Sequence, residues 1–321
     1  MPWLTPIVFK QGHDEPVTRI PIFGDGARTI RFRHVVHIYK DLAIPANTAV
    51  QSITFESIRQ ASQFAAREYP VICVAVAYPT DMDLVPPGVV IGQPLRRFVT
   101  DIAQFEVQRP LPLLFDILYS GAAAGIVDCP SEATSRSGEV EYLVLTNSDI
   151  HLQPAFYRIL AEFIHQGYDV ITVNRRTIEL GDGARTFSPI FLAERGTDHP
   201  GFDCFAFPAS MLDSFARSNS CCGAGNVMRS LLFNLVAHAH RFLMLTHAQM
   251  TYHLGDDKHW ASAAFADYVD FNVSQAKSVI EALARDPTKA KRLAEFITAH
   301  EDDVFREFMS ALTPPRTLES V

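Results

Sequence analysis

The order of apolar and polar positions predicts alternating strands and helices in the first part of the chain. Residues 29–39 alternate in the way of a strand, and residues 52–67 place their apolar side chains at helical spacing before Pro70. Residues 71–78 form a continuous apolar run, which is typical of a strand buried on both faces. A strand, a helix and a second strand are therefore expected in this order.

The same alternation continues toward the C-terminus and indicates an α/β fold with a mostly parallel central sheet flanked by helices. We expect a main domain over residues 1–260 and a helical appendage over residues 261–321, packed on or beside it. The further strands are predicted at residues 141–145, 168–173 and 202–208, and helices at residues 154–166, from 210 and from about 227, with a polar loop at residues 253–260.

Composition and charge narrow the classes of protein. A hydrophobic content of 48% with 23 Phe is ample for a large core. A net charge of -8 argues against nucleic-acid binding, because phosphate-backbone affinity comes from clustered Lys and Arg. No basic and apolar leader and no membrane-spanning run is seen, and the five cysteines lack CxxC spacing. We therefore expect a cytoplasmic protein with no transmembrane segment and with free thiols.

A polar group directly follows the strand predicted at residues 141–145. Ligands of open α/β sheets bind beyond the carboxyl ends of the strands, and Asn147, Ser148 and Asp149 occupy such a place. Asn147 and Asp149 could present two oxygen atoms to one Mg²⁺ or Mn²⁺ ion, which then bridges to phosphate oxygens. The alternative is a turn that caps the helix beginning near Pro154.

A second polar cluster lies at residues 253–260. This segment offers the imidazole of His253, a close backbone approach at Gly255, two carboxylates and the ammonium group of Lys258. Such a loop suits binding of a metal and a diphosphate. The alternative is an exposed charged turn closed by Trp260.

Taken together, the two clusters resemble the pattern of the GT-A glycosyltransferases. That family carries a DxD motif at a strand end and a further metal ligand, usually His, near the end of the core, and the matching residues are Asn147, Asp149 and His253. Retaining members with a galactosyl or glycogenin-like core show His-x-x-Gly-x-x-Lys-Pro-Trp, which HLGDDKHW is similar to with one residue fewer and His259 in place of Pro. The resemblance implies a GT-A (Rossmann-like) fold, Mn²⁺ or Mg²⁺, a UDP- or GDP-sugar donor, and Lys258 on the diphosphate.

Other residues are assigned around this pattern. Asp203 resembles the Asn or Asp that faces the transferred sugar, where it binds hydroxyls or acts in catalysis, although pairing with Arg175 or Arg176 would be a structural alternative. Arg175 could neutralise phosphate or lie at the surface. The donor-binding set is Ser148, Arg175, Gly255 and Lys258, with Asn226 as a possible sugar contact.

The predicted activity is metal-assisted transfer of a sugar from a nucleotide-diphosphate sugar to a hydroxyl acceptor, with retention if the C-terminal motif is a guide. A nucleotidyltransferase is a rival, but the segment KDLAIPANTAVQ after the first strand lacks the Gly-rich basic loop that grips a triphosphate. A non-catalytic nucleotide-sugar-binding or scaffold protein is the other rival. Asn147, in place of the first Asp of the motif, is the feature that favours it.

Overall fold

The chain forms two compact units in the computed structural model, and each is described by itself. The structure describes residues 5–7, 29–40, 46–125, 139–178, 196–254, 262–300, 305 and 308–312. Unit 1 comprises Met1–Arg96, Asp116–Leu212 and His240–Lys258, and unit 2 comprises Arg97–Phe115, Asp213–Ala239 and His259–Val321. Both units are therefore assembled from segments that are far apart in the sequence.

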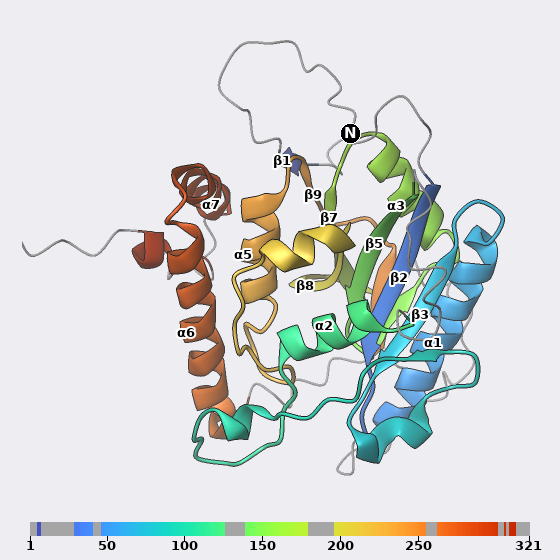
Figure 1. The fold of residues 1–321 in the computed structure, drawn as a ribbon, viewed down its shortest axis with the longest axis horizontal. Helices are drawn as coiled ribbons and strands as arrows, with labels where there is room; N and C mark the ends of the chain where they lie inside the picture. The colour runs from blue at the N-terminus through green and yellow to red at the C-terminus, as the bar shows by residue number, and fades with distance from the viewer. Residues whose placement is uncertain are drawn as a thin grey trace, which may run out of the picture. The chain divides into compact units, whose positions relative to one another are not determined.

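A mixed β-sheet is the centre of unit 1 (Figure 1). In the described part of the chain its order is β1-β9-β7-β8-β5-β2-β3-β4, and β10 pairs with β6 and β7. Strands β3, β2 and β5 are parallel neighbours, and β8 is inserted antiparallel between β5 and β7. The strands are β1 (Thr5–Ile7), β2 (Thr29–His37), β3 (Val71–Val76), β4 (Val90–Ile91), β5 (Glu139–Thr146), β6 (Ile150–Leu152), β7 (Val170–Ile178), β8 (Thr197–Pro208), β9 (Phe242–Leu245) and β10 (Thr251–Leu254).

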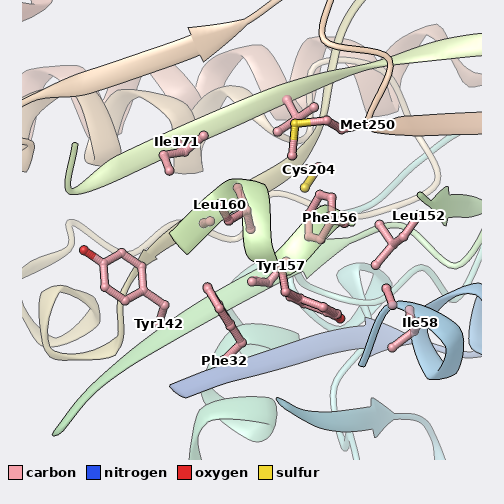
Figure 2. Packing of buried hydrophobic residues seen from close by; sticks show 14 of the residues in the cluster. Phe32, Ile58, Tyr142, Leu152, Phe156, Tyr157, Leu160, Ile171, Cys204 and Met250 are labelled. Atoms are coloured by element: carbon pink, nitrogen blue, oxygen red, sulfur yellow. The ribbon is translucent and has the colours of Figure 1, made fainter. Parts of the chain in front are cut away.

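Helices α1 (Ala46–Ala65) and α3 (Phe156–His165) cover one face of this sheet (Figure 2). Strand side chains alternate between faces, so Phe32 and Val36 of β2 join the core on this side. The amphipathic pattern of α3 supplies Tyr157 and Leu160 to the same cluster. This burial of large apolar side chains is the main stabilising term of the unit.

The other face of β2 meets α2 (Leu114–Ala123) at a glycine. A Cβ atom at Gly121 would lie within van der Waals overlap of the side chain of Val35. The absence of a side chain at Gly121 lets the helix approach the strand closely. His37, two residues beyond Val35, points to this same face of the sheet.

Unit 2 is helical in its described part. Its helices are α5 (Arg229–His238), α6 (Ala266–Leu283) and α7 (Pro287–Ala299), with short 3-10 turns at Val99–Asp101, Ala263–Phe265 and Met309–Leu312. Aromatic rings fill its interior, with Phe105 stacked on Tyr268 at 3.8 Å between ring centroids. The side chain of Asn272 holds the loop before α5, because it bonds the backbone of Cys221 and Gly225.

The α/β class expected from the sequence is confirmed, and several details differ. The segment after residue 208 forms a 3-10 helix, Ala209–Ser214, in place of the predicted α-helix. His253 lies in strand β10, whereas the sequence placed it at the start of a loop. The C-terminal helices share unit 2 with residues 97–115 and 213–239, a grouping that differs from the domain boundary expected at residue 260.

Two further expectations concern the cysteine thiols and membrane-spanning helices, and both are compared with the described residues. Cys73, Cys204, Cys221 and Cys222 are free. Burial raises the pKa of Cys73 to about 12, so this thiol stays protonated at neutral pH. In the part of the chain that the structure describes, no helix has the length and apolar content needed to cross a membrane.

Candidate functional site

The polar groups gather where the strand order reverses. β2 pairs with β3 on one side and with β5 on the other, so the chain winds outward in both directions from this point. Ligands of open α/β sheets bind beyond the carboxyl ends of the strands at such a switch point. Val36 is level with Thr146 in the register, so the next residues, His37 at the end of β2 and Asn147 just after β5, lie side by side.

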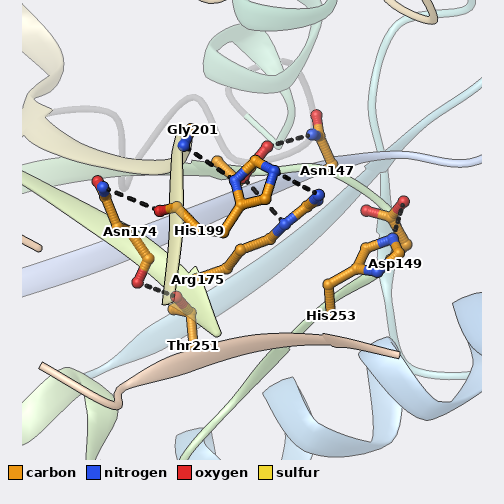
Figure 3. A network of polar contacts seen from close by, with 9 residues as sticks. Asn147, Asp149, Asn174, Arg175, His199, Gly201, Thr251 and His253 are labelled. Atoms are coloured by element: carbon orange, nitrogen blue, oxygen red, sulfur yellow. Dashed lines mark hydrogen bonds and ion pairs between the residues drawn. The ribbon is translucent and has the colours of Figure 1, made fainter. Parts of the chain in front are cut away.

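Asp149 and His253 form the first pair of the site. The short strand β6 aligns Ile150 with His253 of β10, and this pairing brings the two side chains together although 104 residues separate them. The Nε2 atom of His253 lies 3.0 Å from Oδ2 of Asp149 (Figure 3). The other oxygen, Oδ1, is buried and has no hydrogen-bond partner among the described residues.

Asp149 is held in its charged form. Burial on its own would raise the pKa of Asp149, but the hydrogen bond and charge of His253 and the charge of Arg175 outweigh it and lower that pKa below its usual range. The site therefore contains a carboxylate with an unused oxygen next to an imidazole nitrogen. These are ligand types that Mn²⁺ accepts.

Asn147, Asp203 and Arg175 form the second group. Antiparallel pairing of β5 with β8 places Thr146 opposite Cys204, so Asn147 and Asp203 face each other one residue further. Nδ2 of Asn147 donates to Oδ1 of Asp203 at 3.1 Å, and Nε of Arg175 lies 3.4 Å from Oδ2. Both charged side chains are nearly buried, at 12% and 13% exposure. Asn147 therefore positions Asp203 with its amide nitrogen, and only its amide oxygen remains for a cation.

His199 adds a second contact to Arg175. The backbone N–H of Gly201 donates to Nδ1 of His199 at 2.9 Å, while a terminal nitrogen of Arg175 lies 3.3 Å from Nε2 (Figure 3). A neutral imidazole has one unprotonated nitrogen, so it accepts only one of these two hydrogen bonds. The guanidinium group therefore keeps donor capacity for an anion bound at this end of the sheet.

The remaining predicted residues differ in where they lie. Ser148, between Asn147 and Asp149 in the sequence, is buried. Asn226 lies in unit 2 with a left-handed backbone, φ 61°, which a non-glycine residue adopts rarely. Arg176 pairs with Asp198 at 2.6 Å, away from Asp203. Gly255 and Lys258 lie outside the described residues, so their assigned roles stay predictions.

The donor set fits a divalent cation that completes its shell with phosphate. No group of three His, Cys, Asp or Glu side chains suited to a metal is found among the described residues. Mg²⁺ and similar ions, however, are commonly held by one or two carboxylates together with water and substrate phosphates. The orphaned Oδ1 atom of Asp149, beside His253, is the observation that fits such an ion.

Sequence reasoning missed His199, His37 and Tyr39. His37 and Tyr39 alternate at the end of an apolar strand, so the strand-end rule that selected Asn147 would have selected them as well. No local sequence pattern marks His199 as a functional residue, because its partner Arg175 lies in another strand. Contacts of this kind depend on the sheet order and cannot be seen in a local pattern.

We predict that Arg175→Met destabilises the fold by about 3 kcal/mol, because it leaves the nearly buried carboxylate of Asp203 without its cation. Adding Asp203→Asn should restore most of this loss, since the second change removes the unpaired charge. Urea unfolding of the wild type, both single variants and the double variant measures the coupling. Additive effects in this cycle would show that the two charges do not interact.

The comparisons with known proteins gave structural neighbours only. No family model and no curated protein matches the sequence. The structure is similar to S. aureus TarS in complex with UDP-GlcNAc, at 17% identity and a TM-score of 0.44, over 84% of this chain and 72% of that chain. A protein crystallised with a nucleotide sugar is thus among the similar structures.

A second neighbour is Rv0371c from Mycobacterium tuberculosis H37Rv, at 14% identity and a TM-score of 0.35, over 78% of this chain and 99% of that chain. A third is described as a mycobacterial protein, at 16% identity and a TM-score of 0.37, over 83% and 74% of the two chains. At these scores the likeness is in the general course of the chain. The functional assignment rests on the site itself.

Proposed function

We propose that unit 1 binds a nucleotide-diphosphate sugar and that the protein is a glycosyltransferase of the GT-A type, which transfers the sugar to a hydroxyl acceptor. The observation that carries this proposal is the meeting of Asp149 with His253 at the switch point of the sheet. The sequence pattern independently predicts both residues as metal ligands. Their contact across 104 residues supports a shared role.

In this proposal, different side chains bind different parts of the nucleotide-sugar donor. Arg175 lies nearly buried beside Asp203 and faces the negative charge that develops on the departing diphosphate. Among the described residues, the buried Oδ2 atom of Asp203 has no hydrogen-bond partner, and this atom can accept a hydrogen bond from a sugar hydroxyl. Asn147 and Arg175 hold its carboxylate in place.

A divalent cation, Mn²⁺ or Mg²⁺, would be held by Asp149 and His253, and it would neutralise the diphosphate oxygens. During transfer the acceptor oxygen forms a bond to the anomeric carbon while the bond to the diphosphate oxygen breaks. The electron pair of that bond leaves with the diphosphate. In the retaining course that the C-terminal motif favours, the same diphosphate oxygen takes the proton of the acceptor hydroxyl.

One observation favours a second candidate, a nucleotide-sugar-binding protein without transferase activity. Asn147 is a neutral amide whose nitrogen donates to Asp203, so a metal site here would have one carboxylate, Asp149, where a DxD motif supplies two. Such a protein would bind the donor and leave it intact. Product formation therefore separates the two candidates, whereas binding alone does not.

Calorimetric titration with UDP, GDP and CMP, each with and without Mn²⁺, tests the proposal. We expect one diphosphate nucleotide to bind only weakly without the ion and at least about tenfold more tightly with it. Incubation of the matching nucleotide sugar with simple sugar acceptors then tests transfer by mass spectrometry. If no nucleotide binds at any metal concentration, the donor-site proposal is wrong.

A further inference from the structure

Three aromatic rings cluster at the carboxyl ends of β2 and β3. His37 and Tyr39 project to the same side of the strand, and their rings stack with 5.7 Å between centroids and 13° between planes. The ring of Tyr78, which follows β3, meets His37 edge to face at 6.4 Å. The chain thus presents a flat aromatic surface next to the strand end that carries Asn147 and Asp149.

The imidazole of His37 carries an unused hydrogen-bonding atom. Its Nε2 atom is buried and has no hydrogen-bond partner among the described residues. Burial lowers the pKa of His37 to about 4, so the ring is neutral at physiological pH. A neutral ring with an unsatisfied nitrogen suits a planar polar ligand better than a phosphate group.

The backbone of Tyr39 is clamped by a side chain from helix α1. The amide of Gln51 accepts from the N–H of Tyr39 at 3.2 Å and donates to its carbonyl oxygen at 2.9 Å. The main-chain bond from Ile38 to Val76 is the last link to β3, so Tyr39 lies past the paired part of the strand. Gln51 is 3% exposed, and its amide replaces a neighbouring strand at this position.

We propose that Gln51 is a positioning residue that, through the backbone of Tyr39, holds the His37–Tyr39 ring pair as the stacking platform for the donor's nucleobase. This inference rests on the proposed function. The register places His37 beside Asn147 in the adjacent strand, and neighbouring strands lie about 4.8 Å apart. A nucleotide whose diphosphate lies at Asp149 can therefore reach this surface with its base.

The experiment compares UDP and GDP with inorganic pyrophosphate, all in the presence of Mn²⁺. In the wild type the better nucleotide should bind roughly ten- to a hundredfold more tightly than pyrophosphate, because stacking of the base adds to the diphosphate contacts. Gln51→Leu should remove most of this advantage and leave pyrophosphate affinity unchanged. Gln63→Leu, an exposed change on the same helix, is the matched control and should keep the advantage.

Gln51→Glu gives a readout that a general loss of packing would not. A protonated carboxyl group can accept from the N–H of Tyr39 and donate to its carbonyl, as the amide does, whereas a carboxylate can only accept. Lys40, which follows Tyr39 in the sequence, pairs with Asp83 at 2.8 Å. For this variant, the ratio of nucleotide affinity to pyrophosphate affinity should therefore rise toward the wild-type ratio as the pH falls, with both proteins measured at each pH.

The outcomes are distinguishable. If the wild type binds the nucleotides no better than pyrophosphate, or if Gln51→Leu weakens both ligands equally, the inference about Gln51 is overturned and the diphosphate site stands. If the wild type binds neither pyrophosphate nor any nucleotide, the proposed function fails and the inference fails with it.

Discussion

Replacing Asp149 by asparagine is expected to abolish Mn²⁺-dependent nucleotide binding and to lower the transfer rate by at least about 100-fold. The variant keeps the size of the side chain but removes the negative charge that faces His253. A neutral amide oxygen binds a divalent cation more weakly than a carboxylate does, so the ion that compensates the diphosphate charge would be lost. Calorimetry with the preferred nucleotide and an assay of sugar transfer measure the two effects.

Asp83→Asn is the matched control for this change, since it alters an exposed carboxylate that pairs with Lys40. We expect it to bind nucleotide and metal as the wild type does. His253→Gln should reproduce the loss seen for Asp149→Asn, because both residues contribute to one cation site. An Asp149→Asn variant with unchanged metal dependence would contradict the assignment.

Unit 1 is expected to lose about 5 kcal/mol of stability between about pH 6.5 and pH 5, at about 1.7 kcal/mol from each of the three histidines His34, His37 and His151, whose pKa values burial lowers. Burial lowers the pKa of His34 to about 3 and, with smaller effects of Asp149 and His253, that of His151 to about 4. In the unfolded chain these histidine rings take up protons near pH 6.5, whereas in the folded protein they stay neutral. Acid therefore favours the unfolded state.

The hydrogen bonds of His34 explain why its neutral form is required. Its ring nitrogens lie 2.7 Å from the hydroxyl of Tyr157 and 2.8 Å from that of Thr146, so one nitrogen donates and the other accepts. Urea unfolding, followed by circular dichroism at several pH values in this range, measures how steeply the free energy of unfolding changes with pH. His34→Leu should lower stability overall and reduce the slope by about a third. An unchanged slope in this variant would show that His34 does not contribute.

Much of the fold could be predicted because its long elements have strong patterns. The apolar run of β3 and the amphipathic pattern of α3 are local features, and both elements were found in the structure. Strand β9 has only four residues, FLML, and periodicity cannot separate such a run from a helix segment. The antiparallel insertion of β8 depends on the order of strands and leaves no local mark.

The candidate site was only partly predictable for the same reason. Asp149 and His253 were selected from strand-end position and motif spacing, and the structure brings them into contact. The role of Asn147 as a metal ligand stays a prediction, whereas the bond of its amide nitrogen to Asp203, 56 residues further along the chain, has no mark in the local pattern. The clamp of Gln51 on Tyr39 also arises only when α1 packs beside the end of β2. These roles follow from tertiary contacts.

Anomalous diffraction from crystals soaked with Mn²⁺ and the preferred nucleoside diphosphate is the most direct test of the central claim. The account predicts a manganese peak bound by Asp149 and His253, with the diphosphate on the same ion and beside Arg175. A manganese ion and a diphosphate bound elsewhere, with no ion in contact with Asp149 and His253, would contradict it.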